Sequence, residues 1–279
     1  MENGGPSRTA LATAYARAYH QVADQPQIFT DPLAARLLGI TADEPTELDI
    51  AANDRPRRLF FAARSRFAED AVAAAVAAGV RQVVILGAGL DTFAYRNPYP
   101  DVRVFEVDHP ATQAWKRERL ATAGIERPET LTFVPVDFET QTLAAGLESA
   151  GFDRSAPAVF VWLGVVFYLT PSAAHTTLEY IAGQAQPVEV VFDYLQPAAT
   201  EEDRAHQQAR SVQLAGAGEP VFSYSTPDEI AAQLRDLGFT GIEDHSAPDL
   251  IARYLDGSPG FEGETPRALR ASRMLRASR

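Results

Sequence analysis

The chain of 279 residues contains no cysteine, which excludes disulfides and thiolate-bound metals and makes a reducing cytoplasm the expected location. No apolar run approaches the roughly 20 residues that a membrane-spanning helix needs, so no membrane partner is expected. Residues 1–6 are neither basic nor apolar and do not resemble a signal peptide. What is present, 46% hydrophobic and 22% charged residues, is the balance of a globular chain with a real core.

Positive charge is also scarce. The formal net charge of −12 argues against nucleic acid as the main partner, because neutralising phosphates requires clustered Lys and Arg. The remaining basic feature is a series of arginines spaced by three near the C-terminus: Arg267, Arg270, Arg273, Arg276 and Arg279. This spacing is more typical of the charged edge of a strand or helix than of a polyanion site.

Short apolar runs alternate with helical stretches through the middle of the chain. The runs predict strands at 83–86, 102–107, 131–136, 158–163 and 188–192, and the stretches predict helices at 57–78, 112–123 and 172–183. Nearly continuous apolar strands that alternate with helices indicate a parallel sheet covered on both faces. A helix over 227–237 and two late strands, 239–244 and 272–277, complete the prediction.

Two further segments fall outside this alternation. Helices predicted at 8–20 and 33–38 precede the first strand, and a polar helix predicted at 196–213 is inserted after the fifth. Because no repeat or low-complexity linker separates these parts, we predict a single domain over 1–279. Its parts are a helical N-terminal cap (1–55), a ligand-binding core (56–194), an inserted lid (195–226) and the C-terminal part of the sheet (227–279).

A glycine-rich turn, Gly87-Ala-Gly89, follows the first apolar run directly. Glycines let the backbone approach a ligand, and the helix N-terminus that follows supplies oriented donors. An acidic residue at the end of the next strand then accepts hydrogen bonds from ribose hydroxyls. Glu106 and Asp108 lie 17 and 19 residues beyond Gly89, with Asp108 the better placed at the strand end. A tight turn without a ligand remains the alternative.

The residues after the turn discriminate between nucleotide ligands. A dinucleotide site usually has a third small residue three positions after the second glycine, where this chain has Thr92. Asp91, at the mouth of the helix, would repel a pyrophosphate but tolerates a sulfonium ligand that carries an ammonium group. This favours S-adenosylmethionine over NAD.

Several motifs in order over residues 8–195 carry a family resemblance. Examples are Val-Val-Ile-Leu-Gly-Ala-Gly-Leu-Asp-Thr over 83–92 and Phe-Glu-Val-Asp-His-Pro over 105–110; the others lie at 8–11, 16–18, 29–34, 63–67, 136–138 and 162–169. With these motifs the chain resembles the leucine carboxyl methyltransferase-like family, especially its bacterial S-adenosylmethionine-dependent members. The resemblance implies an α/β class I methyltransferase (Rossmann-like) fold with a mostly parallel seven-stranded sheet and helices on both faces. It also implies S-adenosyl-L-methionine as donor and S-adenosyl-L-homocysteine as product.

The resemblance further implies roles in donor binding. Arg64 would bind the donor carboxylate through its bidentate fork, Gly87 and Gly89 would line the methionine part, and Asp108, with Glu106 beside it, would hold the ribose. The alternative for Arg64 is a solvated helix arginine.

The adenine would be bound by residues that follow the third strand. Asp137 would accept from the amino group, and the backbone of Phe138 would contact the ring; a helix cap is the alternative for Asp137. Two positions depart from many relatives, which have Arg in place of Phe93 and an acidic residue in place of Leu163. At Leu163 a backbone carbonyl would replace the missing carboxylate.

The acceptor decides whether a base is needed. A carboxylate is ionised at pH 7, whereas a hydroxyl usually needs a general base, commonly His. Tyr168 and Tyr194, at the ends of the fourth and fifth strands, stand where ligands bind in open parallel sheets. His206 lies in the inserted helix, where a solvated position is the alternative. The five histidines show no metal-ligand spacing, and no metal is expected.

These observations together predict an S-adenosylmethionine-dependent O-methyltransferase that acts on a carboxylate or hydroxyl of a small molecule, such as a secondary metabolite. The alternatives are methylation of a protein C-terminal carboxylate, a non-catalytic S-adenosylmethionine-binding protein and, more distantly, an NAD-linked oxidoreductase. No Gly-x-Ser-x-Gly elbow or phosphate-binding Gly-x-x-x-x-Gly-Lys motif is present. The sequence leaves the oligomeric state open.

Overall fold

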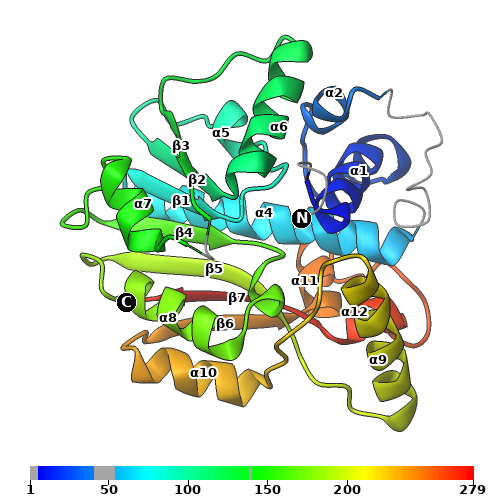
Figure 1. Cartoon of the computed structure of the whole chain (residues 1–279). Helices are drawn as coiled ribbons and strands as arrows, with labels where there is room; N and C mark the ends of the chain where they lie inside the picture. The colour runs from blue at the N-terminus through cyan, green and yellow to red at the C-terminus, as the bar shows by residue number, and fades with distance from the viewer. Residues whose placement is uncertain (1–5, 41–53, 138–139) are drawn as a thin grey trace.

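The computed structural model describes residues 6–40, 54–137 and 140–279, and across them seven strands form one sheet in the order β3-β2-β1-β4-β5-β7-β6 (Figure 1). The first five strands are parallel, and β7 runs antiparallel to both β5 and β6. Their bounds are β1 (Gln82–Leu86), β2 (Arg103–Asp108), β3 (Leu131–Pro135), β4 (Ala158–Trp162), β5 (Val188–Leu195), β6 (Gly241–Ser246) and β7 (Ser272–Ser278).

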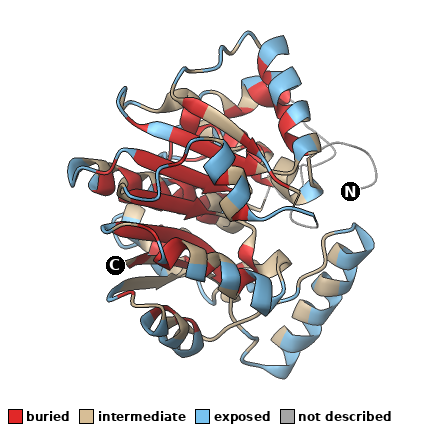
Figure 2. Cartoon of the chain, turned by 60° about the vertical axis from the view of Figure 1, so that its left-hand side comes forward, coloured by how far each residue is buried: buried red, intermediate tan, exposed pale blue. Residues whose placement is uncertain are grey.

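Helices cover both faces of this sheet because the strands are apolar on both sides. In β1, Val83 and Ile85 belong to one buried cluster, while Val84 and Leu86 belong to the other. The first cluster includes side chains of α4 (Arg55–Ala77), α5 (Phe93–Arg96), α11 (Ala247–Tyr254) and α12 (Arg267–Arg270). The second includes side chains of α7 (Leu143–Ser149), α8 (Pro171–Ala182), α10 (Pro227–Asp236) and the short 3-10 turn η1 (Val166–Tyr168). The buried strands lie between these layers in Figure 2.

The N-terminal helices add a third, smaller core at the edge of the molecule. Apolar residues of α1 (Arg8–Ala23) and α2 (Ala34–Leu38) pack with Leu90 and with Leu120 of α6 (Pro110–Thr122). A buried polar group joins α1 to α4: Asp24 accepts from the His20 ring at 2.9 Å and from Arg58 at 2.7 Å. Although burial raises the pKa of Asp24, these two partners lower it to about 2.

The helix α9 (Glu201–Gly216) differs from the others because none of its 16 residues is buried. It lies at the margin of the molecule beside α12 (Figure 1) and is coloured as exposed or intermediate along its whole length (Figure 2). The sequence predicts this helix from residue 196. It begins five residues later because Thr200, in an extended conformation, caps it by accepting from the Asp203 N–H.

The α/β architecture expected from the sequence, a mostly parallel seven-stranded sheet with helices on both faces, is confirmed. The late strand predicted at 239–244 lies at 241–246 as β6, an edge strand whose residues are all half-buried or exposed. Its weak apolar pattern explains the shift of two residues. The division into cap, core, lid and C-terminal part stays a prediction. In the parts of the chain that the structure describes, no helix is both long and apolar enough to span a membrane.

Candidate functional site

The glycine-rich turn follows β1 at the carboxyl edge of the parallel strands. Gly87 and Gly89 have φ values of 62° and 47°, in the left-handed region that other residues rarely adopt. A side chain at Gly87 would overlap Val165, which comes from the loop after β4. A side chain at Gly89 would lie 3.5 Å from Ala10 of α1. The turn therefore requires glycine, and the start of α1 lies against it.

Asp108, at the end of β2, reaches this turn. Its Oδ2 accepts from the Gly89 N–H at 2.5 Å, and its Oδ1 accepts from the His109 N–H at 2.6 Å. Burial raises the pKa of Asp108, while the two backbone bonds act in the opposite direction. The structure thus brings Asp108 to the glycines, as the spacing of 19 residues predicts.

Glu106 does not reach the turn. Its carboxylate is fully buried, where its Oε2 accepts from Lys116 Nζ of α6 at 2.7 Å and its Oε1 has no hydrogen-bond partner. Burial raises the pKa of Glu106 to about 7 against the opposing effect of Lys116. Lys116 is also the one lysine of the chain. Any contribution of Glu106 to ligand binding is therefore indirect.

Arg64 of α4 lies in a buried polar group at the ends of β4 and β5. Its Nη1 donates to Asp193 Oδ2 at 2.7 Å, and Asp193 Oδ1 accepts from the Gly164 N–H at 2.5 Å. Its Nε is buried without a hydrogen-bond partner. The solvated-helix alternative for Arg64 is wrong, because the residue is only 6% exposed. Sequence reasoning missed Asp193, although an acidic residue directly after an apolar run was the available signal.

The two positions that depart from many relatives lie together. Leu163 and Phe93 both line a small cavity of about 20 Å³, along with Asp91 and Glu69. An apolar pair therefore stands where charged residues are expected in those relatives. Asp137 lies two residues beyond the end of β3, and its carbonyl accepts from the N–H groups of residues 140 and 141. Phe138 lies outside the described residues.

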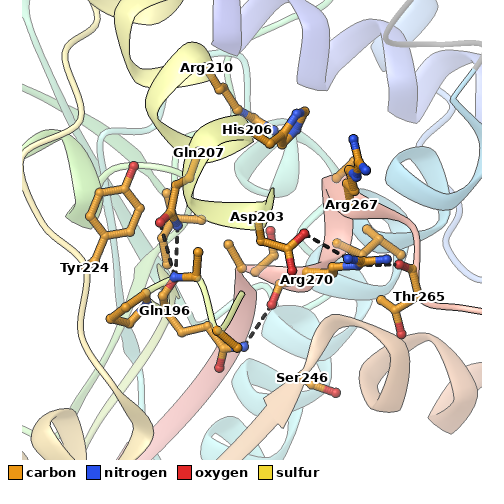
Figure 3. Close-up of a pocket in the computed structure, with 18 of the residues that line it drawn as sticks. Gln196, Asp203, His206, Gln207, Arg210, Tyr224, Ser246, Thr265, Arg267 and Arg270 are labelled. Atoms are coloured by element: carbon orange, nitrogen blue, oxygen red, sulfur yellow. Dashed lines mark hydrogen bonds and ion pairs between the residues drawn. The ribbon is translucent and has the colours of Figure 1, made fainter. Parts of the chain in front are cut away.

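A second, larger cavity of about 520 Å³ lies at the carboxyl end of β5, covered by α9. In Figure 3, Asp203 and Gln207 of α9 contact Arg270 and Gln196 in the lining of this cavity. Asp203 accepts from Arg270 at 2.8 Å, and Gln207 donates to the Gln196 carbonyl at 3.1 Å. His206, on the same helix, also lines the cavity but is exposed, so its role at the acceptor stays a prediction beside the solvated alternative.

The two tyrosines singled out in the sequence are in different surroundings. The Tyr168 hydroxyl is half-buried, 3.1 Å from Thr9 Oγ1, and Thr9 in turn donates to Glu219 after α9. Tyr194 is 3% exposed, and its hydroxyl donates to Asp244 of β6 at 2.7 Å. Neither tyrosine is among the residues that line the cavity: Tyr168 lies at the junction of α1 and the lid segment, and Tyr194 is turned to β6.

The C-terminal arginines are used for pairing within the fold. Arg270 binds Asp203, Arg273 binds Asp244 at 3.1 Å and Arg276 binds Glu189 at 2.7 Å. Arg267 pairs with Glu202, and Arg279 donates to the carbonyl of Ala182. These contacts are those of charged strand and helix edges, the interpretation that the sequence favours.

The strand order and the turn after β1 together define a class I methyltransferase fold. The family model described as Leucine carboxyl methyltransferase matches residues 10–182, and the chain belongs to this family, as its motifs predict. It is 32% identical to "Putative S-adenosyl-L-methionine-dependent methyltransferase YktD" of Bacillus subtilis, over 90% of this chain and 91% of that protein.

Further relatives agree with this assignment. A "Putative S-adenosyl-L-methionine-dependent methyltransferase" of Mycobacterium avium is 32% identical, with 96% of this chain and 94% of that protein covered. The crystal structure of a "putative methyltransferase" from Thermobifida fusca covers 99% of this chain and 96% of its own, with a TM-score of 0.62 and 18% identity. At 18% identity, the likeness to the Thermobifida fusca structure concerns the fold alone.

Proposed function

We propose that this S-adenosylmethionine-dependent methyltransferase transfers the methyl group to an oxygen atom, of a carboxylate or a hydroxyl, on a small molecule. The observation that carries the proposal is the cavity of about 520 Å³ under α9, at the edge of the sheet where the glycine-rich turn also lies. Its volume falls within the range of small-ligand pockets. Its lining combines apolar side chains with a few polar ones, which suits a small organic acceptor better than an extended protein chain.

The residues around the turn fit the methyl donor. Arg64 uses one Nη group on Asp193, so the buried Nε without a partner is available to a second carboxylate, that of the donor's methionine part. Gly87 and Gly89 form the turn with left-handed backbone, and Val165 and Ala10 approach them closely, so we expect the ligand to contact the N–H and C=O groups of the turn. The residues that we propose for donor binding are Arg64, Gly87, Gly89, Asp108, Asp137, Phe138 and the backbone of Leu163, with Glu106 acting through the placement of its strand.

The chemistry demands little of the protein beyond positioning. The bound donor supplies a sulfonium methyl carbon, to which an acceptor oxygen forms a bond as the sulfur–carbon bond breaks and its electron pair stays on sulfur. The chain has to hold the acceptor in line and exclude water. A carboxylate acceptor needs no base, whereas a hydroxyl acceptor must lose a proton. Tyr168 and His206 are the proposed acceptor-side groups, and Tyr194 has a structural role through Asp244.

Two measurements test the proposal. Calorimetry should detect S-adenosylmethionine binding and no NAD binding; the opposite result would refute the assignment. Incubation with the donor and a panel of carboxylic acids and phenols should then yield methyl esters or ethers by mass spectrometry, together with S-adenosylhomocysteine. Labelling of a protein band in a lysate would favour the C-terminal carboxylate alternative. Donor binding without product from any acceptor would favour a non-catalytic role.

A further inference from the structure

The inner face of α9 covers a cavity rather than the core. Its half-buried residues, Asp203, Gln207, Ser211 and Leu214, recur at helical spacing, and all four line the cavity. A helix that packs on a core buries an apolar stripe, and α9 buries no residue at all. The space beneath it is therefore left for a ligand. Apolar side chains that would contact the body of this ligand include Leu195, Leu214, Val221, Pro248 and Leu269.

The arginines around this cavity differ in their pairing. Arg270 is matched by Asp203 at 2.8 Å and Glu264 at 3.2 Å, and Arg267 is matched by Glu202. Arg210 also lines the cavity, but it forms no ion pair or hydrogen bond with any residue that the structure describes. One exposed positive charge at the cavity is thus not engaged in an ion pair, in a chain whose net charge is −12.

A second arginine lies within electrostatic range of Arg210. Arg57, at the start of α4, has its pKa lowered by burial and by the like charge of Arg210. Its ion pair with Asp54 is weak, since the nearest nitrogen and oxygen are 4.0 Å apart. The like charges of Arg57 and Arg210 repel each other, and the distant carboxylate of Asp54 offsets this only weakly, which leaves a local excess of positive charge. An anion placed between them would relieve this repulsion and accept hydrogen bonds from both forks.

Arg210 also lies within electrostatic range of two tyrosines, one of which leads toward the donor site. Burial raises the pKa of Tyr168 and of Tyr224, and Arg210 acts in the opposite direction on both. Arg210 is therefore near Tyr168, which belongs to η1, directly after the loop whose Val165 packs against Gly87. An anion held here would orient a ligand with one end toward the donor site and its apolar body under α9.

We propose that Arg210 and Arg57 bind an anionic group of the methyl acceptor, so that the acceptor is an organic anion whose apolar body fills the cavity under α9. The inference rests on the proposed function, which it makes more specific. The shared chemistry is that of a carboxylate, sulfonate or phosphate ester attached to an apolar frame. A neutral molecule of the same shape should bind weakly.

The test uses two fluorescent probes that differ in charge and share their apolar frame. One is 1-anilinonaphthalene-8-sulfonate, which carries a sulfonate, and the other is the neutral N-phenyl-1-naphthylamine. Both are titrated into the full chain loaded with S-adenosylhomocysteine. The variant Arg210→Gln should weaken binding of the sulfonate probe by roughly tenfold or more, the effect expected for loss of a charge-assisted hydrogen bond. Its affinity for the neutral probe should stay within about twofold of that of the unsubstituted chain. Arg57→Gln should act in the same direction, and Arg210→Lys should retain part of the affinity.

The matched control is Arg204→Gln. Arg204 is on the same helix and is exposed, as Arg210 is, but it does not line the cavity and pairs with Glu201. It should leave both probes unaffected. Three outcomes would each overturn the proposal. The first is equal binding of the sulfonate probe by Arg210→Gln and by the unsubstituted chain, and the second is an equal loss of affinity for both probes. The third is that carboxylates displace the sulfonate probe no better than the corresponding amides do. Because probe binding needs no turnover, a failure here is distinct from failure to bind donor or to form methylated product.

Discussion

The buried pair of Glu106 and Lys116 makes the stability of the protein depend on pH in a way that Glu106→Gln should remove. Burial raises the pKa of Glu106 from the ordinary 4.5 to about 7. The folded state therefore holds this proton more tightly than the unfolded chain. The stabilising contribution of protonated Glu106 is fully present below pH 4.5 and is lost as the pH rises to about 7. At 1.36 kcal/mol for each pKa unit, the loss amounts to about 3 kcal/mol.

Urea unfolding at several pH values between 4.5 and 8 tests this prediction. The free energies of unfolding of the unsubstituted chain and of Glu106→Gln should be similar at pH 4.5. At pH 8 the variant should be the more stable by about 3 kcal/mol. Glu126→Gln, which changes an exposed glutamate, serves as the control and should show no such divergence. A difference between Glu106→Gln and the unsubstituted chain that stays constant with pH would refute the reasoning.

Three further predictions concern the donor site and the N-terminal core. Arg64→Gln should weaken S-adenosylmethionine binding at least tenfold by calorimetry, a loss of about 1.5 kcal/mol or more, while Arg66→Gln, on the exposed side of the same helix, should not; equal affinities would contradict the proposed role. Gly87→Ala should destabilise the fold by about 1–3 kcal/mol in thermal unfolding. Adding Val165→Ala to that variant should recover the part that is due to overlap of the two side chains. An unchanged Tm of Gly87→Ala would count against the close contact between Gly87 and Val165. Asp24→Asn should lower the free energy of unfolding by about 2 kcal/mol at pH 7. The pKa of Asp24 is about 2 in the folded state against an ordinary value of 3.8, so its carboxylate contributes stability above pH 3.8 that is lost as the pH falls toward 2. A difference between the two unfolding free energies that persists at pH 2 would contradict this prediction.

The parts of the fold that the sequence predicts well are those with a strong local pattern. The five parallel strands are continuous apolar runs, and the turn at Gly87 and Gly89 follows the first of them directly. Asp108 could be placed because the distance along the chain between a turn and the next strand end is short and regular. In each case the signal lies within about 20 residues of the feature it predicts.

The features that escaped prediction depend on contacts between distant segments. Asp193 pairs with Arg64 across 129 positions, and no local pattern indicates which of the acidic residues at strand ends will do so. The burial of Tyr194 follows from β6 supplying Asp244, 50 positions away. Local alternation suggests that Glu106 shares a face with Asp108, but only the packing of Lys116 from α6 decides which of the two carboxylates remains near the turn.

The burial of the chain's one lysine has a practical consequence. Lys116 has a side chain that is 1% exposed and is held against Glu106, so an amine-reactive reagent can modify a lysine of this protein only when α6 separates from β2. The rate at which Lys116 becomes labelled is then a direct measure of how often this part of the molecule opens. If bound donor holds Asp108 and its strand in place, adding it should slow that labelling, and the mass change at Lys116 would report ligand binding at the end of the same strand.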